Sequence, residues 1–553
     1  NISRALTQAI KKAGTYQLLS TGRVQGPALK IVCDREREIT AFIPTPYWEL
    51  ELNGKLSKTN ILAAHKKGKI QDEKIALDIL KKTKGQPATI VDIKAREVKK
   101  DPPNPFDLTS LQMEAHGKLK IAPKQTLSIA QELYTNGWIS YPRTSSQELP
   151  ESIGYKKILE AIGRQKEYIE EAKMVLAKKT LKPNNGKKKD PAHPAIYPTG
   201  VPPKALEGRE KKLYDLIVRR FLATFGDVAI RETVTYTIDC AKELFLAKGT
   251  LTKEPGWMTL YGVYGKQKEE ELPKANINDS IIDPKVTKLD KETTPPNRYT
   301  EASIIKALEK KNLGTKATRA SIVDTLFTRK YIEGKQIKAT DLGLKVDTIL
   351  SKYVPKITDD EMTRNFEEQM EEIRNNKKKP EEVLKHAQEV IKEIITDFAK
   401  HESDLGVGLR DTFLETRDRV ETLGTCPNCD AGMVKLRRGK FGRFAACDQY
   451  PECKTTYSLP NTGDIEPTDK FGEKTKAPII KIVRKGRAQE VCISPDEQEV
   501  HHLKEEGETC DKCKKGKMLL RKSVYGQFLG CDKYPKCKNI KQIPKDEDAE
   551  KKE

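Results

Sequence analysis

Residues 137–150, GWISYPRTSSQELP, place Tyr141 two positions before Arg143, directly after a stretch with helical spacing. A tyrosine hydroxyl is a weak nucleophile at neutral pH because its pKa is about 10, so a catalytic tyrosine needs a cation or a base beside it. In an extended turn Arg143 would face the same side as Tyr141, where its guanidinium could hold a phosphodiester and stabilise charge on the phosphoryl oxygens. Taken alone, the Tyr-x-Arg pattern favours a packed aromatic residue over a nucleophile.

Eight of the eleven cysteines form two identical patterns, with intervals of 2, 17 and 5 residues. They are Cys426, Cys429, Cys447 and Cys453, and then Cys510, Cys513, Cys531 and Cys537. Two tight turns that each present a pair of thiolates complete a tetrahedral zinc site, in a module too small to fold on a hydrophobic core alone. We therefore predict two structural Zn²⁺ sites. A disulfide framework is the alternative, and an intracellular chain argues against it.

The repeat extends beyond the cysteines, because KFGRFAACDQYPECK matches VYGQFLGCDKYPKCK 84 residues later. These aromatic rings, interleaved with basic residues, could stack on unpaired bases or fill the hydrophobic side of each module. Between the repeats, residues 461–505 have the strands of a third module but only Cys492, so we predict a ribbon without zinc. Cys33 and Cys492 have no evident partner and are predicted to be inert. The matched rings are Phe441 and Tyr525, Phe444 and Phe528, and Tyr450 and Tyr534.

Length and charge limit the possible classes of protein. A chain of 553 residues predicts three or four domains. The 102 Lys and Arg residues against 81 Asp and Glu residues give a net charge of +21, which indicates a polyanionic partner, with nucleic acid as the first candidate. The sequence has neither a long apolar run nor a secretory signal, so we predict an intracellular, cytoplasmic protein without a membrane segment.

Helical and β-rich patterns alternate along the first 410 residues. We expect helices in residues 1–35, 111–220 and 296–410, and strands in residues 36–110 and 221–295. Because β-rich segments flank a helical one and are themselves flanked by helical ones, the chain is predicted to leave two domains and re-enter them. The fold class is therefore multidomain α+β.

Several local patterns predict individual elements. Pro123 suits the first turn of a helix that Gly137 ends, with an apolar side formed by Leu127, Ala130, Leu133 and Tyr134. A half-buried strand is predicted by the alternation of Val234, Tyr236, Ile238 and Cys240, which makes Cys240 a core residue. Residues 256–265, GWMTLYGVYG, are expected to form another strand. Two helices around Gly314 and a hairpin after Tyr331 suggest a winged helix-turn-helix.

Four segments, taken in order, resemble the type IA DNA topoisomerases, in particular the archaeal topoisomerase I and topoisomerase III branch. STGRVQGPALKIVCDREREI resembles the DNA-contacting segment of that family, GWISYPRTSSQELP its active-site segment, AHPAIYPTG its histidine segment, and LGTKATRASIVDTL its later winged-helix segment. The resemblance covers essentially the whole chain. Four collinear motifs are more specific than any one of them.

The resemblance implies roles for individual residues. Tyr141 would attack a phosphodiester of single-stranded DNA and leave a 5′-phosphotyrosine and a free 3′-hydroxyl, while Arg143 stabilises the scissile phosphate and His193 lies near the cleaved strand. Resealing would reverse cleavage, so no ATP is needed, and the sequence has no GxxxxGK[ST] loop. The residues implied to line the path of the DNA strand are Ser20, Thr21, Gly22, Arg23, Val24, Gln25, Thr318 and Arg319, with Arg4 as a weaker candidate.

The resemblance also implies a toroidal core that relaxes negatively supercoiled DNA, working as a monomer associated with the nucleoid. In this interpretation a β-rich arch carries a gate that bears Tyr141 and swings away from a base, and the base and gate are two winged-helix-like helical domains. The implied parts are the base (1–35 and 296–410), the arch (36–110 and 221–295), the gate (111–220), a zinc ribbon (411–460), a zinc-free ribbon (461–505), a second zinc ribbon (506–540) and a charged tail (541–553).

Members of this family also have an amino-terminal Toprim domain, with a proton-donating glutamate and a D-x-D-x-E cluster that binds Mg²⁺. The one D-x-D-x-E match here, Asp546–Glu550, lies in a charged tail and is rejected, because Mg²⁺ ligands need a rigid frame. We expect Asn1 to mark a truncated sequence. Without Toprim, these residues are expected to bind single-stranded DNA but not to relax supercoils alone.

Two other functions compete with this interpretation. A tyrosine recombinase also forms a DNA phosphotyrosine, but it would place its tyrosine near the carboxyl end, whereas some 400 residues follow Tyr141. A non-catalytic, zinc-ribbon protein that binds single-stranded DNA and retains the topoisomerase fold is the alternative from another class. The polarity of a covalent DNA adduct separates the first alternative, and an in-frame Toprim sequence upstream would separate the second.

Overall fold

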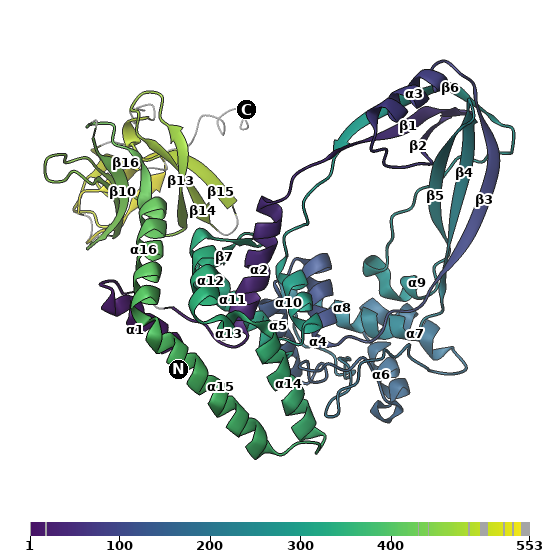
Figure 1. Ribbon diagram of the computed structural model, residues 1–553, viewed down its shortest axis with the longest axis horizontal. Helices are drawn as coiled ribbons and strands as arrows, with labels where there is room; N and C mark the ends of the chain where they lie inside the picture. The colour runs from purple at the N-terminus through teal and green to yellow at the C-terminus, as the bar shows by residue number, and fades with distance from the viewer. Residues whose placement is uncertain are drawn as a thin grey trace. The chain divides into compact units, whose positions relative to one another are not determined.

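Figure 1 shows the protein as a computed structural model. The chain divides into two compact units, Asn1–Val407 and Gly408–Glu553, each of which is described by itself. Four features singled out in the sequence, Phe441, Tyr525, Tyr534 and Asp546–Glu550, lie outside the described residues. The described residues are 2–16, 19–429, 431–440, 442–484, 487–497, 507–523, 526–533 and 536–542.

Helices make up most of the first unit. No helix in the described ranges is both long enough and apolar enough to cross a membrane. The helices are α1 (Ile2–Lys12), α2 (Gln25–Thr40), α3 (Glu73–Thr83), α4 (Leu108–Glu114), α5 (Pro123–Thr135), α6 (Tyr155–Ile162), α7 (Ile169–Leu176), α8 (Gly208–Thr224), α9 (Trp257–Tyr261), α10 (Glu301–Lys310), α11 (Arg319–Thr328), α12 (Asp341–Tyr353), α13 (Pro355–Thr358), α14 (Asp360–Arg374) and α15 (Pro380–Lys400), with α16 (Glu402–Glu421) running into the second unit.

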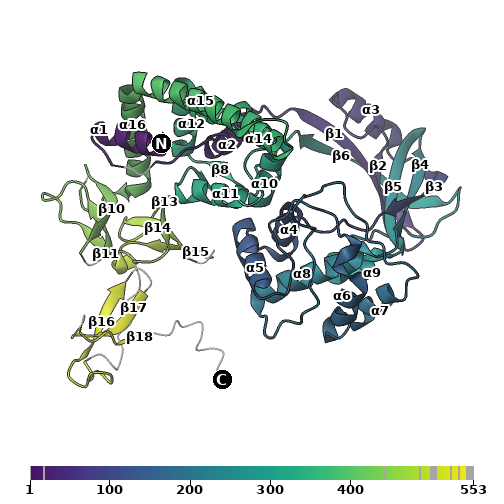
Figure 2. The same cartoon turned by 90° about the horizontal axis from the view of Figure 1, so that it is seen from below.

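Six antiparallel strands of the first unit close into a barrel, in the order β1-β2-β5-β4-β3-β6 (Figure 2). The predicted alternation in β4 is confirmed, because Tyr236, Ile238 and Cys240 are buried in the barrel core. Helices α4 to α8 lie between β3 and β4 in the chain, so the polypeptide leaves the barrel and returns to it. The strands are β1 (Pro46–Leu56), β2 (Thr59–His65), β3 (Ala88–Lys100), β4 (Ala229–Cys240), β5 (Glu243–Glu254) and β6 (Ser280–Glu292).

The helices between β3 and β4 pack around a separate hydrophobic core, built largely by α5, α6 and α8. Pro123 starts α5 as predicted, and Gly137, with a φ of 76°, turns the chain just after the helix ends. Ala130 and Leu133 are buried as expected, whereas Tyr134 is 40% exposed. Its ring therefore does not belong to the apolar side of α5, and the prediction is wrong for this residue.

The prediction of a strand in residues 256–265 is also wrong, because the segment forms α9 and a short 3-10 turn at Gly262–Tyr264. Gly256 and Gly262 have φ values of 46° and 57°, which break an extended strand. Tyr261 and Tyr264 are buried in the helical core instead of the barrel, and Arg220 donates a hydrogen bond to the Tyr261 hydroxyl at 3.2 Å. Packing of the aromatic rings thus outweighs their strand propensity.

The other strand boundaries differ in smaller ways. The expected strands begin near residue 36, but α2 continues to Thr40 and β1 starts only at Pro46. The lysine-rich stretch between the two predicted strands contains β2 and α3, which the sequence patterns did not identify. The hairpin predicted after Tyr331 is confirmed as β7 (Ile332–Glu333) and β8 (Lys338–Ala339), which follow α10 and α11.

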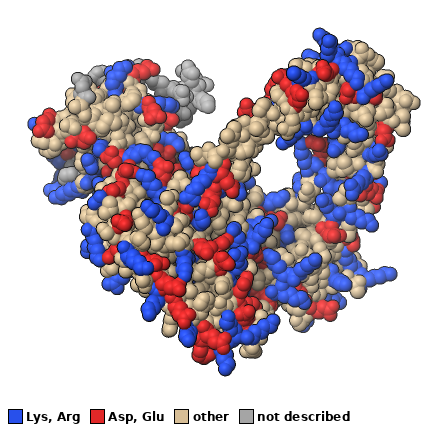
Figure 3. Space-filling view, in the orientation of Figure 1, with Lys and Arg blue, Asp and Glu red and all other residues tan. Residues whose placement is uncertain are grey.

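Basic side chains gather over the barrel strands on the face shown in Figure 3. β3 alone carries Lys94, Arg96, Lys99 and Lys100 on its outer half, where most side chains are exposed. A surface rich in Lys and Arg attracts a polyanion. This distribution agrees with the net charge of +21.

The second unit consists of three small antiparallel sheets. The first and middle sheets share one hydrophobic cluster, which includes Leu423, Val434, Ile480 and Ile482, whereas the third sheet has its own small cluster. In sheet order they are β12-β11-β10-β9, then β13-β14-β15, then β16-β17-β18. Their bounds are β9 (Thr422–Thr425), β10 (Met433–Gly439), β11 (Gly442–Cys447), β12 (Thr456–Ser458), β13 (Asp464–Phe471), β14 (Pro478–Arg484), β15 (Arg487–Cys492), β16 (Met518–Ser523), β17 (Gly526–Cys531) and β18 (Ile540–Gln542).

Candidate active site

The segments that carry Tyr141 and His193 lie side by side as extended chains. The Ser140 amide donates to the Tyr197 carbonyl at 2.8 Å, and the Thr199 amide donates to the Trp138 carbonyl at 3.0 Å. The Thr144 hydroxyl also donates to the carbonyl of His193 at 3.2 Å, and Thr144 is fully buried. These contacts bring together two motifs that are about fifty residues apart in the sequence.

Tyr141 is half-buried and its ring contacts two other rings. The ring centroid of Tyr141 lies 4.5 Å from that of His193 and 5.3 Å from that of Tyr134. A cavity of about 370 Å³ opens beside it, lined also by Arg143, His193 and Lys316. The three predicted catalytic residues therefore share one cavity, which a ring packed in the core would not face.

Arg143 has a free donor in this arrangement. Its Nε atom is buried and has no hydrogen-bond partner among the described residues. A buried guanidinium N–H without a partner costs free energy, unless a ligand supplies an acceptor. A phosphate oxygen in the cavity would be such an acceptor.

Asp190 is the buried carboxylate of the site. It accepts hydrogen bonds from the amides of Ser145, Ala192 and His193 at 3.1 to 3.3 Å, from the Ser145 hydroxyl at 3.0 Å, and from Lys316. Burial raises the pKa of Asp190, but the bond from Lys316 and those from Ser145 and Ala192 outweigh it, so the net pKa lies well below the ordinary value. The carboxylate is therefore charged at neutral pH.

Most of the predicted DNA-path residues lie in two neighbouring loops, residues 19–24 and 313–318, whereas Gln25 and Arg319 begin the helices that follow, α2 and α11. A Cβ added to Gly314 would lie 3.1 Å from the Val24 side chain, so the loops touch. The Ser20 hydroxyl accepts a hydrogen bond from the Gln25 side-chain amide at 2.9 Å, and Arg23 forms an ion pair with Glu367 at 2.9 Å. The hydroxyl of Thr21 is buried without a partner among the described residues, and the Gly22 carbonyl accepts from the Gly26 amide at 2.9 Å.

The second loop leads into α11, where burial lowers the pKa of Arg319. Arg319 and Lys316 line a polar cavity of about 500 Å³, and Lys316 and Asp190 belong to both this cavity and that of Tyr141. Thr318 bonds to Thr315 at the start of α11. Arg4 is exposed on α1. Among the described residues, neither Arg4 nor Ser20 lines either cavity.

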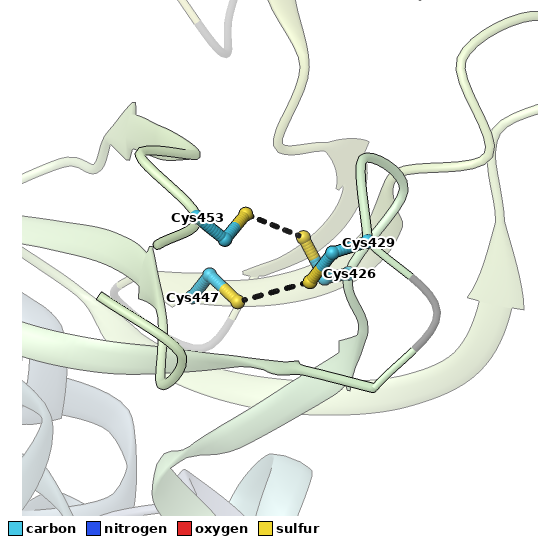
Figure 4. A group of neighbouring side chains, drawn as sticks. All are labelled: Cys426, Cys429, Cys447 and Cys453. Atoms are coloured by element: carbon cyan, nitrogen blue, oxygen red, sulfur yellow. Dashed lines mark hydrogen bonds between the residues drawn. The ribbon is translucent and has the colours of Figure 1, made fainter. Parts of the chain in front are cut away.

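In the second unit, the cysteines converge as predicted (Figure 4). Cys426 and Cys453 have sulfurs 3.7 Å apart, and those of Cys429 and Cys447 are 3.5 Å apart. In the later repeat the corresponding distances are 3.8 Å and 3.6 Å. Tetrahedral zinc with Zn–S bonds of about 2.3 Å requires sulfurs about 3.8 Å apart, so the geometry fits zinc and excludes the disulfide alternative.

A glycine lies directly beneath each set of sulfurs. A Cβ at Gly432 would lie 2.3 Å from the Cys447 sulfur, and one at Gly516 would lie 2.5 Å from the Cys531 sulfur. Each glycine carbonyl accepts from the amide of the first cysteine of its set, at 2.9 Å and 2.7 Å. Both turns are thus shaped to leave room for four sulfurs and a metal ion.

The middle sheet closes the same turn without a set of cysteines. The Gly472 amide donates to the Ala477 carbonyl at 2.9 Å. In the same way, the amide of the first cysteine of each ribbon donates to the carbonyl of Gly432 or Gly516. The Glu497 carboxylate accepts from the amides of Lys474 and Thr475 at 3.0 Å and 2.9 Å and from the Thr475 hydroxyl at 2.6 Å. The positions of the middle sheet that correspond to the four cysteines of each ribbon are therefore occupied by Gly472, Thr475, Cys492 and Glu497.

The aromatic residues of the repeat differ in exposure. Tyr450 is 69% exposed, whereas Phe444 and Phe528 are half-buried on β11 and β17. Phe444 also packs near Gly439 across the hairpin. Among the described rings, Tyr450 is therefore the one best placed to meet a ligand, and the other two fill the modules.

Comparison with known proteins identifies the family. Residues 1–385 match the family model described as DNA topoisomerase. The chain belongs to the type IA DNA topoisomerases. Residues 423–462 and 507–546 match the model described as topoisomerase DNA binding C4 zinc finger, and both ranges contain the clustered cysteines of this topoisomerase.

Relatives and a solved structure agree with this assignment to the topoisomerases. The chain is 44% identical over 551 residues to DNA topoisomerase 1 of Methanocaldococcus jannaschii. The matched region covers 99% of this chain and 71% of the relative. It is 43% identical over 502 residues to DNA topoisomerase 1 of Pyrococcus horikoshii, and this match covers 89% of the chain and 73% of the relative. The structure of full-length topoisomerase I from Thermotoga maritima matches with a TM-score of 0.56 at 25% identity, covering 85% of this chain and 75% of that one.

Sequence patterns missed several residues that lie beside Tyr141 in this candidate site. Asp190 lies two residues before the histidine segment, and Lys316 lies inside the quoted winged-helix segment, yet nothing in either pattern links two residues so far apart. Tyr134 was assigned to the buried side of α5, whereas its ring contacts Tyr141. Only the fold brings these side chains to the cavity.

Proposed function

We propose that this chain cuts one strand of DNA through Tyr141, lets a second strand pass, and reseals the break, which relaxes negatively supercoiled DNA. The observation that carries the proposal is the cavity shared by Tyr141, Arg143 and His193 in a type IA topoisomerase fold. A tyrosine hydroxyl that could serve as nucleophile shares this cavity with a guanidinium that could stabilise the phosphoryl oxygens and with an imidazole.

In the proposed reaction the Tyr141 hydroxyl oxygen attacks phosphorus as its proton leaves to a base or water. The bond from phosphorus to the 3′-oxygen breaks, and that oxygen takes up a proton to give the free 3′-hydroxyl. Arg143, whose buried Nε–H has no partner in the part of the chain that the structure describes, would stabilise the charge on the phosphoryl oxygens. Because one phosphodiester replaces another, resealing needs no ATP.

The described residues near Tyr141 do not fit Mg²⁺. Asp190 is the buried carboxylate there, and Lys316 and four other donors already occupy it. The clusters suited to a metal among the described residues are the two sets of cysteines. We propose that a Toprim domain outside these 553 residues supplies the Mg²⁺ ligands and the proton-donating glutamate, and that the chain alone binds single-stranded DNA without relaxing it.

We further propose that the segments act as arch (36–110 and 221–295), gate (111–220) and base (1–35 and 296–410). The closed barrel and the separate core of α5, α6 and α8 support this division. Similarity to archaeal relatives supports the archaeal topoisomerase I branch, and the excess of basic residues supports association with the nucleoid as a monomer. Exposed Tyr450 is proposed to stack on unpaired bases.

Tyr141→Phe tests the proposal when Mg²⁺ and a Toprim domain are supplied. The variant should bind a single-stranded oligonucleotide as the wild type does but form no covalent adduct, and wild-type protein should retain a label at the 3′ end of the DNA. Tyr47→Phe, on the barrel, is the control and should keep the adduct. Undiminished adduct in Tyr141→Phe would show that another residue is the nucleophile, and retention of a 5′ label would indicate recombinase chemistry.

A further inference from the structure

Asp190 joins three segments that the proposed reaction would have to move or hold. Its donors come from the Tyr141 strand (Ser145), from the histidine loop (Ala192 and His193) and from the loop before α11 (Lys316). The first two segments lie in the gate and the third lies in the base. The Asp190 carboxylate therefore links the strand of Tyr141 and the loop of His193, both in the gate, to Lys316 in the base.

Among the described residues, three ion pairs join gate and base, and the pair between Asp190 and Lys316 is the most buried of them. The Asp190 side chain is 4% exposed, whereas Asp324 and Glu309, the carboxylates of the other two pairs, are 42% and 24% exposed. Lys124 pairs with Asp324 at 2.6 Å and Lys188 with Glu309 at 2.8 Å. Exposed pairs contribute little to stability, but a buried carboxylate that loses its cation is strongly destabilised.

We propose that Asp190 is a positioning residue that holds His193 and the Tyr141 strand in register only while Lys316 of the base is docked against it. This inference rests on the proposed function. When the gate leaves the base, Asp190 loses its cation, and hydration of the carboxylate loosens its bonds to the amides of Ala192 and His193. Cleavage and resealing are thereby confined to the closed gate.

Lys316→Met removes the cation, Lys316→Arg retains it, and Lys124→Met removes a gate-to-base ion pair that does not touch Asp190. Amide exchange reports directly on the bonds to Asp190. We expect Lys316→Met to speed amide exchange at Ser145, Ala192 and His193 by about tenfold or more. A hydrogen bond to a charged group stabilises the closed state by enough free energy to slow exchange by about that factor. Lys316→Arg should restore protection, and Lys124→Met should leave these amides unchanged.

Adduct formation with Mg²⁺ and a Toprim domain gives the second measurement. Lys316→Met should lower the rate of adduct formation at saturating DNA by about tenfold, with an unchanged Kd for the oligonucleotide. A raised Kd with unchanged amide exchange would overturn the inference, because Lys316 would then be a phosphate contact only. Equal exchange in Lys316→Met and Lys124→Met would overturn it as well.

The two proposals fail in different ways. If the wild-type protein forms no adduct under any condition, the proposed function fails, and amide exchange still shows whether Lys316 holds the network. If the wild type forms adduct and exchange does not respond to Lys316→Met, the role of Asp190 fails alone.

Discussion

The two four-cysteine ribbons and the sheet between them close the same backbone turn by different means. Each ribbon gathers four sulfurs over a glycine, Gly432 or Gly516. The middle sheet has Gly472 in place of the first cysteine and holds its turn with three hydrogen bonds to Glu497. A Cβ at Gly472 would lie 2.3 Å from a Glu497 carboxylate oxygen, so the carboxylate fills the space that sulfurs fill elsewhere.

The size of the apolar core predicts which sheets depend on a metal. The third sheet has a small cluster in which Met518 and Leu529 are the buried residues besides cysteines. The first and middle sheets share a larger cluster that includes Leu423, Val434 and Ile480. A fully buried aliphatic side chain contributes about 1.5–3 kcal/mol, so the shared core offers stability that zinc must provide in the third sheet.

Zinc removal is expected to have the largest effect, and to act most strongly on the third sheet. Structural zinc contributes roughly 10 kcal/mol or more of apparent binding free energy in small modules, so chelation should unfold β16–β18 completely. Amide exchange should show that β13–β15 remain protected. Native mass spectrometry should give two zinc ions per chain, and a third ion would contradict the comparison.

Single ligand substitutions should separate the two ribbons. Cys513→Ser should unfold the third sheet, whereas Cys429→Ser should cost the first sheet its zinc but leave β10 and β11 paired, because the shared core remains. Circular dichroism and zinc content of the purified chain measure both effects. Equal loss of structure in the two variants would show that the shared core does not stabilise the first ribbon.

Glu497→Ala should destabilise the middle sheet by about 1–3 kcal/mol, because the turn loses the acceptor of three hydrogen bonds from Lys474 and the half-buried Thr475. Glu490→Ala is the matched control: Glu490 pairs on the surface with Lys470 at 2.7 Å, and its loss should cost at most about 1 kcal/mol. Denaturant unfolding followed by exchange at β13–β15 gives both values. Zinc content should remain the same in both variants.

Acid should affect the middle sheet last. Hydrogen bonds from the Thr475 hydroxyl and the Lys474 amide lower the pKa of Glu497 from 4.5 to about 2. Because the folded pKa lies below the unfolded one, this stabilisation is present above about pH 4.5 and is lost as the pH falls from there toward about 2. Thiolates take up protons and release zinc at higher pH, so zinc loss should precede unfolding of β13–β15 in an acid titration.

Local signals in the sequence predicted the zinc sites and many elements. Ligand spacing is a local property, so the eight cysteines were identified without the fold, and Pro123 and the alternation in β4 marked their elements in the same way. The turn closed by Glu497 carries no comparable signal, since hydrogen bonds from a turn to a carboxylate need no fixed spacing. Residues 256–265 were misassigned because their rings pack in a core whose other members lie elsewhere in the chain.

The candidate site shows the same limit. The motifs around Tyr141 and His193 were found from sequence, and the structure brings both side chains to one cavity. Asp190 and Lys316 were not found, because an ion pair between residues 126 positions apart depends on the packing of two segments. Their roles in the reaction remain predictions for the experiments above.

The pairing of β3 differs along its length. β3 pairs with β4 along nearly its whole length, from Ala88 opposite Cys240 to Lys100 opposite Ala229, but with β6 only at Ala88 and Thr89. The outer half of β3 is therefore the margin of a thin ribbon, and the chain leaves for the helices at the tip of that ribbon. Because hydrogen bonds to β4 hold this part of β3 on one side alone, we expect it to open more readily than the closed part of the barrel.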